Sequence, residues 1–186
     1  MDVAVAGSAD HAGFIALAGE VEQWFGPMID DPEFQETLDK NIRRGSALCV
    51  RGGDDQVLGG LLLSARPSRY RIGWLVVAGD FRGRGVGRAL VAESIKRMVP
   101  PVSILEVLTF GAEHPAAVPS GARPSTRGWD SSRARSSKVP GRTARVSGSG
   151  GIGCHTVPIY GDSSSAESWD GSSCRMVAWS ADVLRG

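Results

Sequence analysis

The hydrophobic positions near the start of the chain follow the period of an α-helix. Ser8 or Asp10 is placed to cap this helix, and Gly26-Pro27 would end it. The apolar positions lie three or four residues apart: Phe14, Leu17, Val21, and Trp24 or Phe25. Because they would share one face, we predict a single amphipathic helix between the cap and residue 25.

A second helical run has clearer ends. Asp31 stands where a capping side chain is needed, Pro32 suits the first turn, and Glu33 would lie beside the positive end of the helix dipole. The apolar positions then recur every four residues: Phe34, Leu38 and Ile42. With Gly45 as the stop, these features predict a helix that begins at residue 32.

Shorter apolar runs with the lengths of strands follow. They cover residues 47–50, 57–63, 70–77 and 102–110. Gly52-Gly53-Asp54-Asp55 between the first two runs predicts a hairpin. Before the last strand, a helical run carries Leu90, Val91, Ile95 and Met98 and ends at Pro100-Pro101. The order helix, helix, three strands, turn, helix and strand predicts a mixed α/β domain.

The composition of the chain changes after about residue 123. Residues 124–186 contain 14 serines and 9 glycines among 63 positions, whereas every phenylalanine lies in residues 1–123. A segment this poor in large apolar side chains cannot bury enough surface to offset the entropy of ordering it. We therefore predict one folded domain, residues 1–123, and a disordered tail, residues 124–186.

The charge and the cysteines limit the classes of partner and compartment. A formal net charge of +1 gives no reason to expect a nucleic-acid partner. Cys49, Cys154 and Cys174 form no CxxC pair and have no paired histidines, which argues against a disulfide framework or a metal site. No apolar run approaches the ~18 residues of a membrane span, and the N-terminus lacks a basic leader. We expect a cytoplasmic protein with no membrane partner.

The most distinctive motif is Arg-Gly-Arg-Gly-Val-Gly-Arg at residues 82–88, between a predicted strand and a predicted helix. Glycines let the backbone approach a phosphate, and the first amide groups of a helix are unpaired donors at its positive end. Arg84 and Arg88 would add charge-assisted hydrogen bonds. The motif is either a tight connection or an anion cradle, and its alternating positive charges favour the cradle.

The element order and this turn resemble the GCN5-related N-acetyltransferase (GNAT) family over residues 1 to about 123. The specific part is the family's acetyl-CoA motif of Gln or Arg, two residues, Gly, one residue, and Gly or Ala. Arg82, Gly85 and Gly87 match it. The resemblance implies a mixed, mainly antiparallel sheet flanked by helices. It also implies transfer of an acetyl group from acetyl-CoA to a primary amine of a small molecule or peptide, by direct attack in a ternary complex. The oligomeric state stays open, with a homodimer among the options.

The same resemblance implies which residues meet acetyl-CoA. Backbone amides of the turn would hold the CoA pyrophosphate: Arg82, Gly83, Arg84, Gly85, Val86, Gly87 and Arg88. The strand end, Leu75, Val76 and Val77, would pair with the pantetheine arm as an added strand does. A backbone N–H near Val77 would face the thioester oxygen, in the space left where the strand 102–110 diverges. Arg82 is equally suited to fixing the turn through hydrogen bonds to carbonyl groups.

Glu106 stands in the middle of an apolar strand, where an unpaired charge is costly. Its side chain either faces solvent or belongs to the site, as the general base that takes the amine's proton. Since the strand 70–77 offers no carboxylate, a water-mediated base is the alternative. Trp24, Phe25 and Met28 are either core residues or, by the resemblance, walls of the acceptor pocket.

The tail departs from the family pattern in a specific way. The family has a sequence like ARxFYERLGF in a helix after the divergent strand, whereas Ala122-Arg123 is followed here by PSTRGWDSSR. One permitted codon set for those ten residues, read from its third base, encodes FYEGLGFVP. Our hypothesis is that one nucleotide is missing near the Arg123 codon, so that the last helix and closing strands are lost or disordered. Resequencing the gene there tests it. Tyr160 lies in the altered tail and should not take the role of the family's acidic tyrosine.

Two other functions are kept open. The chain could be a CoA-binding remnant that has lost catalysis, because its last third departs from the family. A dinucleotide-binding oxidoreductase could use Gly83, Gly85 and Gly87, but a meander rather than repeated strand-helix units precedes the turn.

Overall fold

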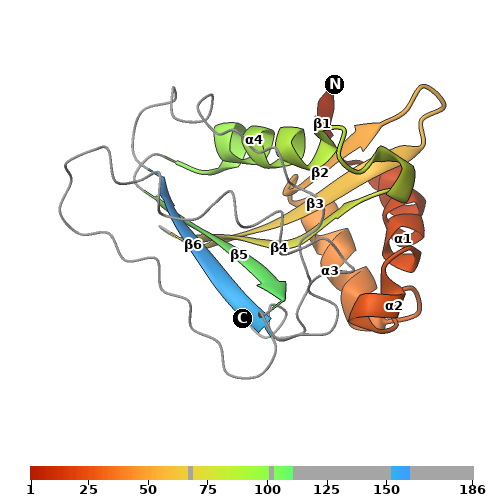
Figure 1. Ribbon diagram of the computed structural model, residues 1–186, viewed down its shortest axis with the longest axis horizontal. Coiled ribbons are helices and arrows are strands. Elements are labelled where there is room, and N and C mark those ends of the chain that lie inside the picture. The colour runs from red at the N-terminus through yellow and green to blue at the C-terminus, as the bar shows by residue number, and fades with distance from the viewer. Residues whose placement is uncertain (67–68, 101–102, 111–151, 160–186) are drawn as a thin grey trace.

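The computed structural model describes residues 1–66, 69–100, 103–110 and 152–159 (Figure 1). The strands in these residues form one six-stranded sheet in the order β1-β2-β3-β4-β5-β6. All neighbours are antiparallel except β4 and β5, which run parallel. The strands are β1 Val3–Val5, β2 Ala47–Arg51, β3 Val57–Arg66, β4 Arg69–Val77, β5 Ser103–Phe110 and β6 Ile152–Ile159. The prediction of a mixed, mainly antiparallel sheet flanked by helices is confirmed.

Helices cover both faces of the sheet (Figure 1). The helices are α1 His11–Gly19, α2 Glu22–Phe25, α3 Pro32–Arg43 and α4 Val86–Met98. Because side chains alternate along a strand, β4 contributes to both layers. Leu75 and Val77 lie in the core under α4, whereas Trp74 and Val76 lie in the core under α1 and α3.

Local chemistry fixes the second predicted helix and the hairpin. Asp31 caps α3 by accepting a hydrogen bond from the Glu33 N–H at 3.0 Å, and Pro32 occupies the first turn. Gly45 follows the helix with φ of 67°. The hairpin between β2 and β3 turns through Asp55, which takes φ of 61°. Both predictions are confirmed, because capping and turn residues act within a few positions of themselves.

The single first helix predicted from the sequence is wrong. The chain forms a short 3-10 helix, Ser8–Asp10, then α1, and then the separate α2. The break lies at Val21, whose φ of −119° and ψ of −4° depart from helical values. Val21 is fully buried beside the other apolar positions. The apolar spacing therefore reflects one shared core rather than one continuous helix.

Two strands were not expected. β1 has only three residues and pairs at the sheet edge with β2, so its alternation was too short to detect. β6 lies inside the tail that we predicted to be disordered, and it pairs with the whole of β5. Its sequence, IGCHTVPI, is richer in β-branched residues than the serine-rich tail around it. The remainder of the tail lies outside the described residues.

A buried ion pair ties the start of α1 to the sheet. Asp10 is 5% exposed, and its two carboxylate oxygens each accept a hydrogen bond from Arg51 at 2.7 Å. One of them also accepts the Gly7 N–H at 2.7 Å. The hydrogen bonds from Arg51 hold the pKa of Asp10 below its ordinary value of 3.8.

We expect Asp10→Asn to lower the free energy of unfolding at neutral pH by about 2 kcal/mol, because charge-assisted hydrogen bonds are lost. The Asp10 pKa is lower in the folded state than in the unfolded state. Its stabilisation is therefore complete above about pH 4 and is lost as the pH falls through the folded-state value. Urea unfolding of both proteins between neutral and acidic pH measures this. Equal pH dependence in the two proteins would refute it.

Candidate functional site

The glycine-rich turn joins the end of β4 to the start of α4. A 3-10 turn, Gly79–Phe81, follows β4, and the chain then passes through Gly83 and Gly85 with φ of 75° and 86°. These left-handed values favour glycine. Gly85 is the N-cap of α4, and the first helical hydrogen bond runs from the Ala89 N–H to the Gly85 carbonyl at 3.0 Å.

The start of α4 presents donors of the kind that bind an anion. The amides of Val86 and Gly87 precede the first helical hydrogen bond and have no acceptor within α4. A Cβ built on Gly85 would meet no atom of the described residues within 4 Å. Arg84 is exposed, with its guanidinium carbon 5.3 Å from the Phe81 ring centroid. The turn therefore offers backbone donors of the kind that bind a phosphate group, and its role as an anion cradle stays a prediction.

Arg82 fixes the turn to its surroundings. Its Nε donates a hydrogen bond to the Val77 carbonyl at 3.0 Å, and its guanidinium carbon lies 5.4 Å from the Trp24 ring centroid. Its Nη2 is 3.8 Å from the Glu20 carboxylate, which also accepts the Gly79 N–H at 2.8 Å. The Arg82 N–H is already bonded to the Gly79 carbonyl at 3.3 Å. Arg82 was expected either to contact the phosphate or to fix the turn, and its side chain fixes the turn. No signal in the sequence had marked Glu20 as its partner.

We expect Arg82→Gln to lower the free energy of unfolding by about 1–2 kcal/mol, since it removes a hydrogen bond to a carbonyl and a cation–π contact. Arg84→Gln is the matched control, because Arg84 is exposed and its guanidinium lies over the Phe81 ring rather than on a carbonyl of the strand. Its effect should stay within about 0.5 kcal/mol. Urea unfolding compares the two variants, and similar losses in both would contradict a positioning role for Arg82.

A β-bulge interrupts β4 at the centre of the sheet. Leu62 and Leu63 are consecutive on β3, yet they pair with Trp74 and Ile72 on β4, which leaves Gly73 as an extra residue. A bulge bends its strand and increases the local twist. An isolated glycine in a strand-like run is a signal for a bulge that our sequence prediction did not use.

β4 and β5 part at this bulge. Their parallel register extends from Arg69 with Ile104 to Ile72 with Val107, and Figure 1 shows β5 running away from β4 beyond that point. Among the described residues, no strand pairs with the β5-facing side of residues 74–77. We call this side of β4 the open edge.

The open edge presents the backbone groups of two of the three predicted strand residues. The Ala78 N–H donates to the Leu58 carbonyl at 2.9 Å, so Ala78 faces β3. Because backbone groups alternate in direction along a strand, Val76 also faces β3, whereas Leu75 and Val77 face the open edge. The position of the Val77 carbonyl on that side agrees with its hydrogen bond from Arg82.

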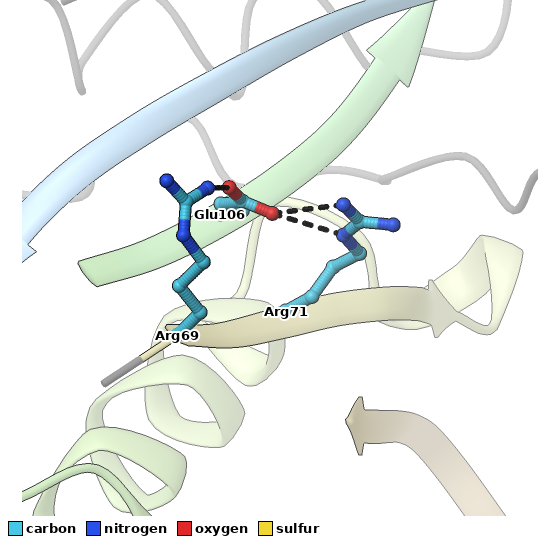
Figure 2. Close-up of polar contacts among 3 residues, drawn as sticks. All are labelled: Arg69, Arg71 and Glu106. Carbon is cyan, nitrogen blue, oxygen red and sulfur yellow. Dashed lines mark hydrogen bonds and ion pairs between the residues drawn. The ribbon is translucent and has the colours of Figure 1, made fainter. Parts of the chain in front are cut away.

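Glu106 lies between two arginines rather than in solvent. Its side chain is 10% exposed, and Figure 2 shows Arg69 and Arg71 reaching it from β4. Arg69 Nη1 is 2.8 Å from Oε1, and Arg71 donates to Oε2 through Nε at 3.1 Å and Nη2 at 2.9 Å. Both carboxylate oxygens are therefore engaged. The charge that seemed costly in an apolar strand is paired across the sheet.

The predicted pocket residues lie in the core layer under α1 and α3. Met28 is fully buried, while Trp24 and Phe25 are partly buried against the same layer. Trp74 is 1% exposed, between Phe14 and Phe34, and its indole N–H has no hydrogen-bond partner among the described residues. A pocket-forming role for these side chains stays a prediction.

The structure also bears on the expectations about membranes, metal sites and cysteines. No helix in the described part of the chain is both long and apolar enough to cross a membrane. Within the same residues, His, Cys, Asp and Glu side chains do not gather in threes as a metal site would need. Burial raises the pKa of the Cys49 thiol to about 11. Tyr160 and the hypothetical break near Arg123 lie outside the described residues.

Comparisons with known proteins agree on one family. A family model described as the acetyltransferase (GNAT) family matches residues 15–118, more than half of the chain. A GNAT-family structure from Desulfovibrio desulfuricans has a TM-score of 0.54 at 22% identity, and the match covers 84% of this chain and 99% of that one. A GNAT-family acetyltransferase structure from Bacillus cereus has a TM-score of 0.51 at 12% identity, with 85% and 96% covered. A search of curated proteins found no match.

Proposed function

Because the chain belongs to the GNAT acetyltransferase family, we propose that it transfers an acetyl group from acetyl-CoA to the primary amine of a small molecule or peptide. Both substrates would be bound together, and the amine would attack directly. The observation that carries this function is the open edge of β4, which leads straight into the turn at the start of α4. The extended pantetheine arm of CoA and its pyrophosphate need these two features side by side.

The chain's own residues fit acetyl-CoA at this place. The amides of Val86 and Gly87 would hold the pyrophosphate, with Gly83 and Gly85 giving the backbone its close approach. Arg84 and Arg88 would contribute positive charge from the same segment. Arg82 would act one step away, by holding the turn and the Val77 carbonyl in place.

The open edge would bind the acyl-bearing end of acetyl-CoA and polarise its thioester carbonyl. Acetyl-CoA supplies an acetyl group activated as a thioester. Leu75 and Val77 would hydrogen-bond the arm along β4, and a backbone N–H from this pair would donate to the thioester oxygen. Val77 is the residue expected from the resemblance. Leu75 is two residues closer to Gly73, where the strands part, and so lies further from the turn that holds the pyrophosphate.

The proton of the amine would leave through water rather than to Glu106. Arg69 and Arg71 donate three hydrogen bonds to that carboxylate, which occupy three of its roughly four lone-pair sites and hold it against the two guanidinium groups. We therefore keep the water-mediated base that the sequence left open. The cytoplasmic location and the homodimer stay predictions.

A CoA-binding remnant is the second candidate. The family match ends at residue 118, shortly before the point where the tail departs from the family sequence. A chain of this kind would still contain the turn and the open edge. It would bind acetyl-CoA but release no CoA when amines are added.

Thermal unfolding with acetyl-CoA or with NAD tests the function. At a ligand concentration 100 times Kd, binding stabilises the folded state by about 2.7 kcal/mol, which raises Tm measurably. We expect a shift with acetyl-CoA and none with NAD. Release of CoA with a broad amine panel then separates an enzyme from a remnant, and a frame-restored chain serves as comparison. Absence of an acetyl-CoA shift in both chains would overturn the proposal.

A further inference from the structure

Three arginines gather beside the point where β4 and β5 part. Arg69 and Arg71 lie on β4, and Arg66 stands directly opposite Arg69 on β3. Like charges in directly opposed positions destabilise a sheet unless something compensates them. The only carboxylate that contacts these side chains among the described residues is Glu106. Within the described residues, the positive cluster (Arg66, Arg69 and Arg71) therefore carries two positive charges in excess.

The positive cluster faces away from α4. Ile72, Leu105 and Val107 all lie in the core under α4. Their neighbours Arg71 and Glu106 must then project from the opposite face, because side chains alternate along a strand. Trp74 lies on that same face, just past the bulge. The cluster thus sits on the α1 and α3 side of the sheet, next to the parting of the strands.

Donors in the positive cluster remain available for a ligand in the part of the chain that the structure describes. Arg69 is 64% exposed and uses one of its N–H groups on Glu106, while Arg71 is 37% exposed and uses two. Each guanidinium has five N–H donors. Glu106 holds both side chains in fixed positions (Figure 2), so little ordering is needed when an anion arrives.

We propose that the positive cluster binds an anionic group of the acceptor, so that the preferred substrate is a primary amine that also carries a carboxylate or phosphate. Arg71 lies four residues from Leu75, about 13 Å along an extended strand. An anion held at the cluster would leave the amine of a small acceptor near the open edge. The protein has an acceptor site only if it transfers acetyl groups, so this inference rests on the proposed function. Glu106 is then a positioning residue for the arginines.

Pairs of amines that differ only in the anionic group test this inference. β-Alanine is compared with propylamine, γ-aminobutyrate with butylamine, and phosphoethanolamine with ethanolamine, and the last pair separates phosphate from carboxylate. We measure CoA release and, independently of turnover, the Tm shift that each amine gives with and without acetyl-CoA. We expect the anionic member of at least one pair to be preferred roughly tenfold or more, as charge-assisted hydrogen bonds provide.

Substitutions in the positive cluster then test whether these arginines cause the preference for anionic amines. Arg71→Gln and the more exposed Arg69→Gln should each reduce this preference by several fold, measured as the ratio of CoA release with the anionic amine to CoA release with its neutral partner. Arg97→Gln is the matched control, because Arg97 pairs with Glu93 on α4, on the other face of the sheet. A wild-type protein without preference, or a preference that survives both substitutions, would overturn the inference. A missing acetyl-CoA shift would instead count against the proposed function, and the Tm shifts measured without acetyl-CoA would still decide whether the cluster binds anions.

Discussion

Gly85→Val is expected to abolish the stabilisation of this protein by acetyl-CoA. Gly85 has φ of 86° at the N-cap of α4, a conformation that a β-branched residue adopts only under strain. A valine would also add a bulky side chain directly before the amides of Val86 and Gly87, at a position where glycine has none. Both effects disturb the amides of Val86 and Gly87. We expect the Tm shift with acetyl-CoA to disappear.

Gly26→Val separates strain from loss of the site. Gly26 has φ of 85°, and a Cβ there also meets no described atom within 4 Å. The two substitutions should therefore lower the stability of the unliganded protein by similar amounts, about 1–3 kcal/mol. Gly26 is the C-cap of α2 and lies outside the segment 82–88, so its variant should keep the acetyl-CoA shift. Loss of the shift in both variants, or its retention in Gly85→Val, would mean that the turn is not the cofactor site.

Gly59→Ala is expected to weaken both stability and acetyl-CoA binding. An added Cβ would lie 2.7 Å from a methyl group of Val86 and 3.3 Å from the Val76 carbonyl oxygen. Val86 is the first residue of α4, so relief of this clash must move the start of that helix away from the sheet. Overpacking of this kind costs about 1–3 kcal/mol. Displaced amides should in addition raise the Kd for acetyl-CoA.

Gly60→Ala is the matched control on the next residue. Its Cβ would approach the Phe14 ring to 2.5 Å, under α1 on the opposite face of the sheet. Urea unfolding should show a loss of about 1–3 kcal/mol for this variant as well. Titration with acetyl-CoA should show an altered Kd only for Gly59→Ala. An equal change of Kd in both variants would mean that cofactor binding reports overall stability rather than the position of α4.

Some of these features were predictable because their causes are local. The cap at Asp31, the proline after it and the glycine stop fix α3 within a few residues. The turn at residues 82–88 was identified from its glycines and alternating arginines, and Gly83 and Gly85 adopt the positive φ that glycine allows. Such residues act through their own backbone or through that of near neighbours, so the sequence alone reveals them.

Other features depend on partners that are distant in the sequence. The spacing of Phe14 and Val21 indicates that both side chains lie in one core, but it does not reveal the helix break at Val21. Burial depends on the sheet and helices that pack against these residues, not on whether the helix is continuous. Gly73 causes a bulge because of how β3 pairs with β4. Glu106 was considered as a base from its place in an apolar strand, and only the register of β4 with β5 brings Arg69 and Arg71 to it.

The sequence by itself determined α3, α4, the strands β2 to β5 and the glycine-rich turn, because each follows from the periodicity or conformational freedom of adjacent residues. The family followed from the resemblance of the motif at residues 82–87. Only the tertiary structure decided which backbone groups of β4 remain unpaired, what Arg82 holds, and where the charge of Glu106 is compensated. Each of these depends on the register between strands or on contacts between elements many residues apart. Local propensity does not encode such contacts, because they form only when the sheet and its helices pack together.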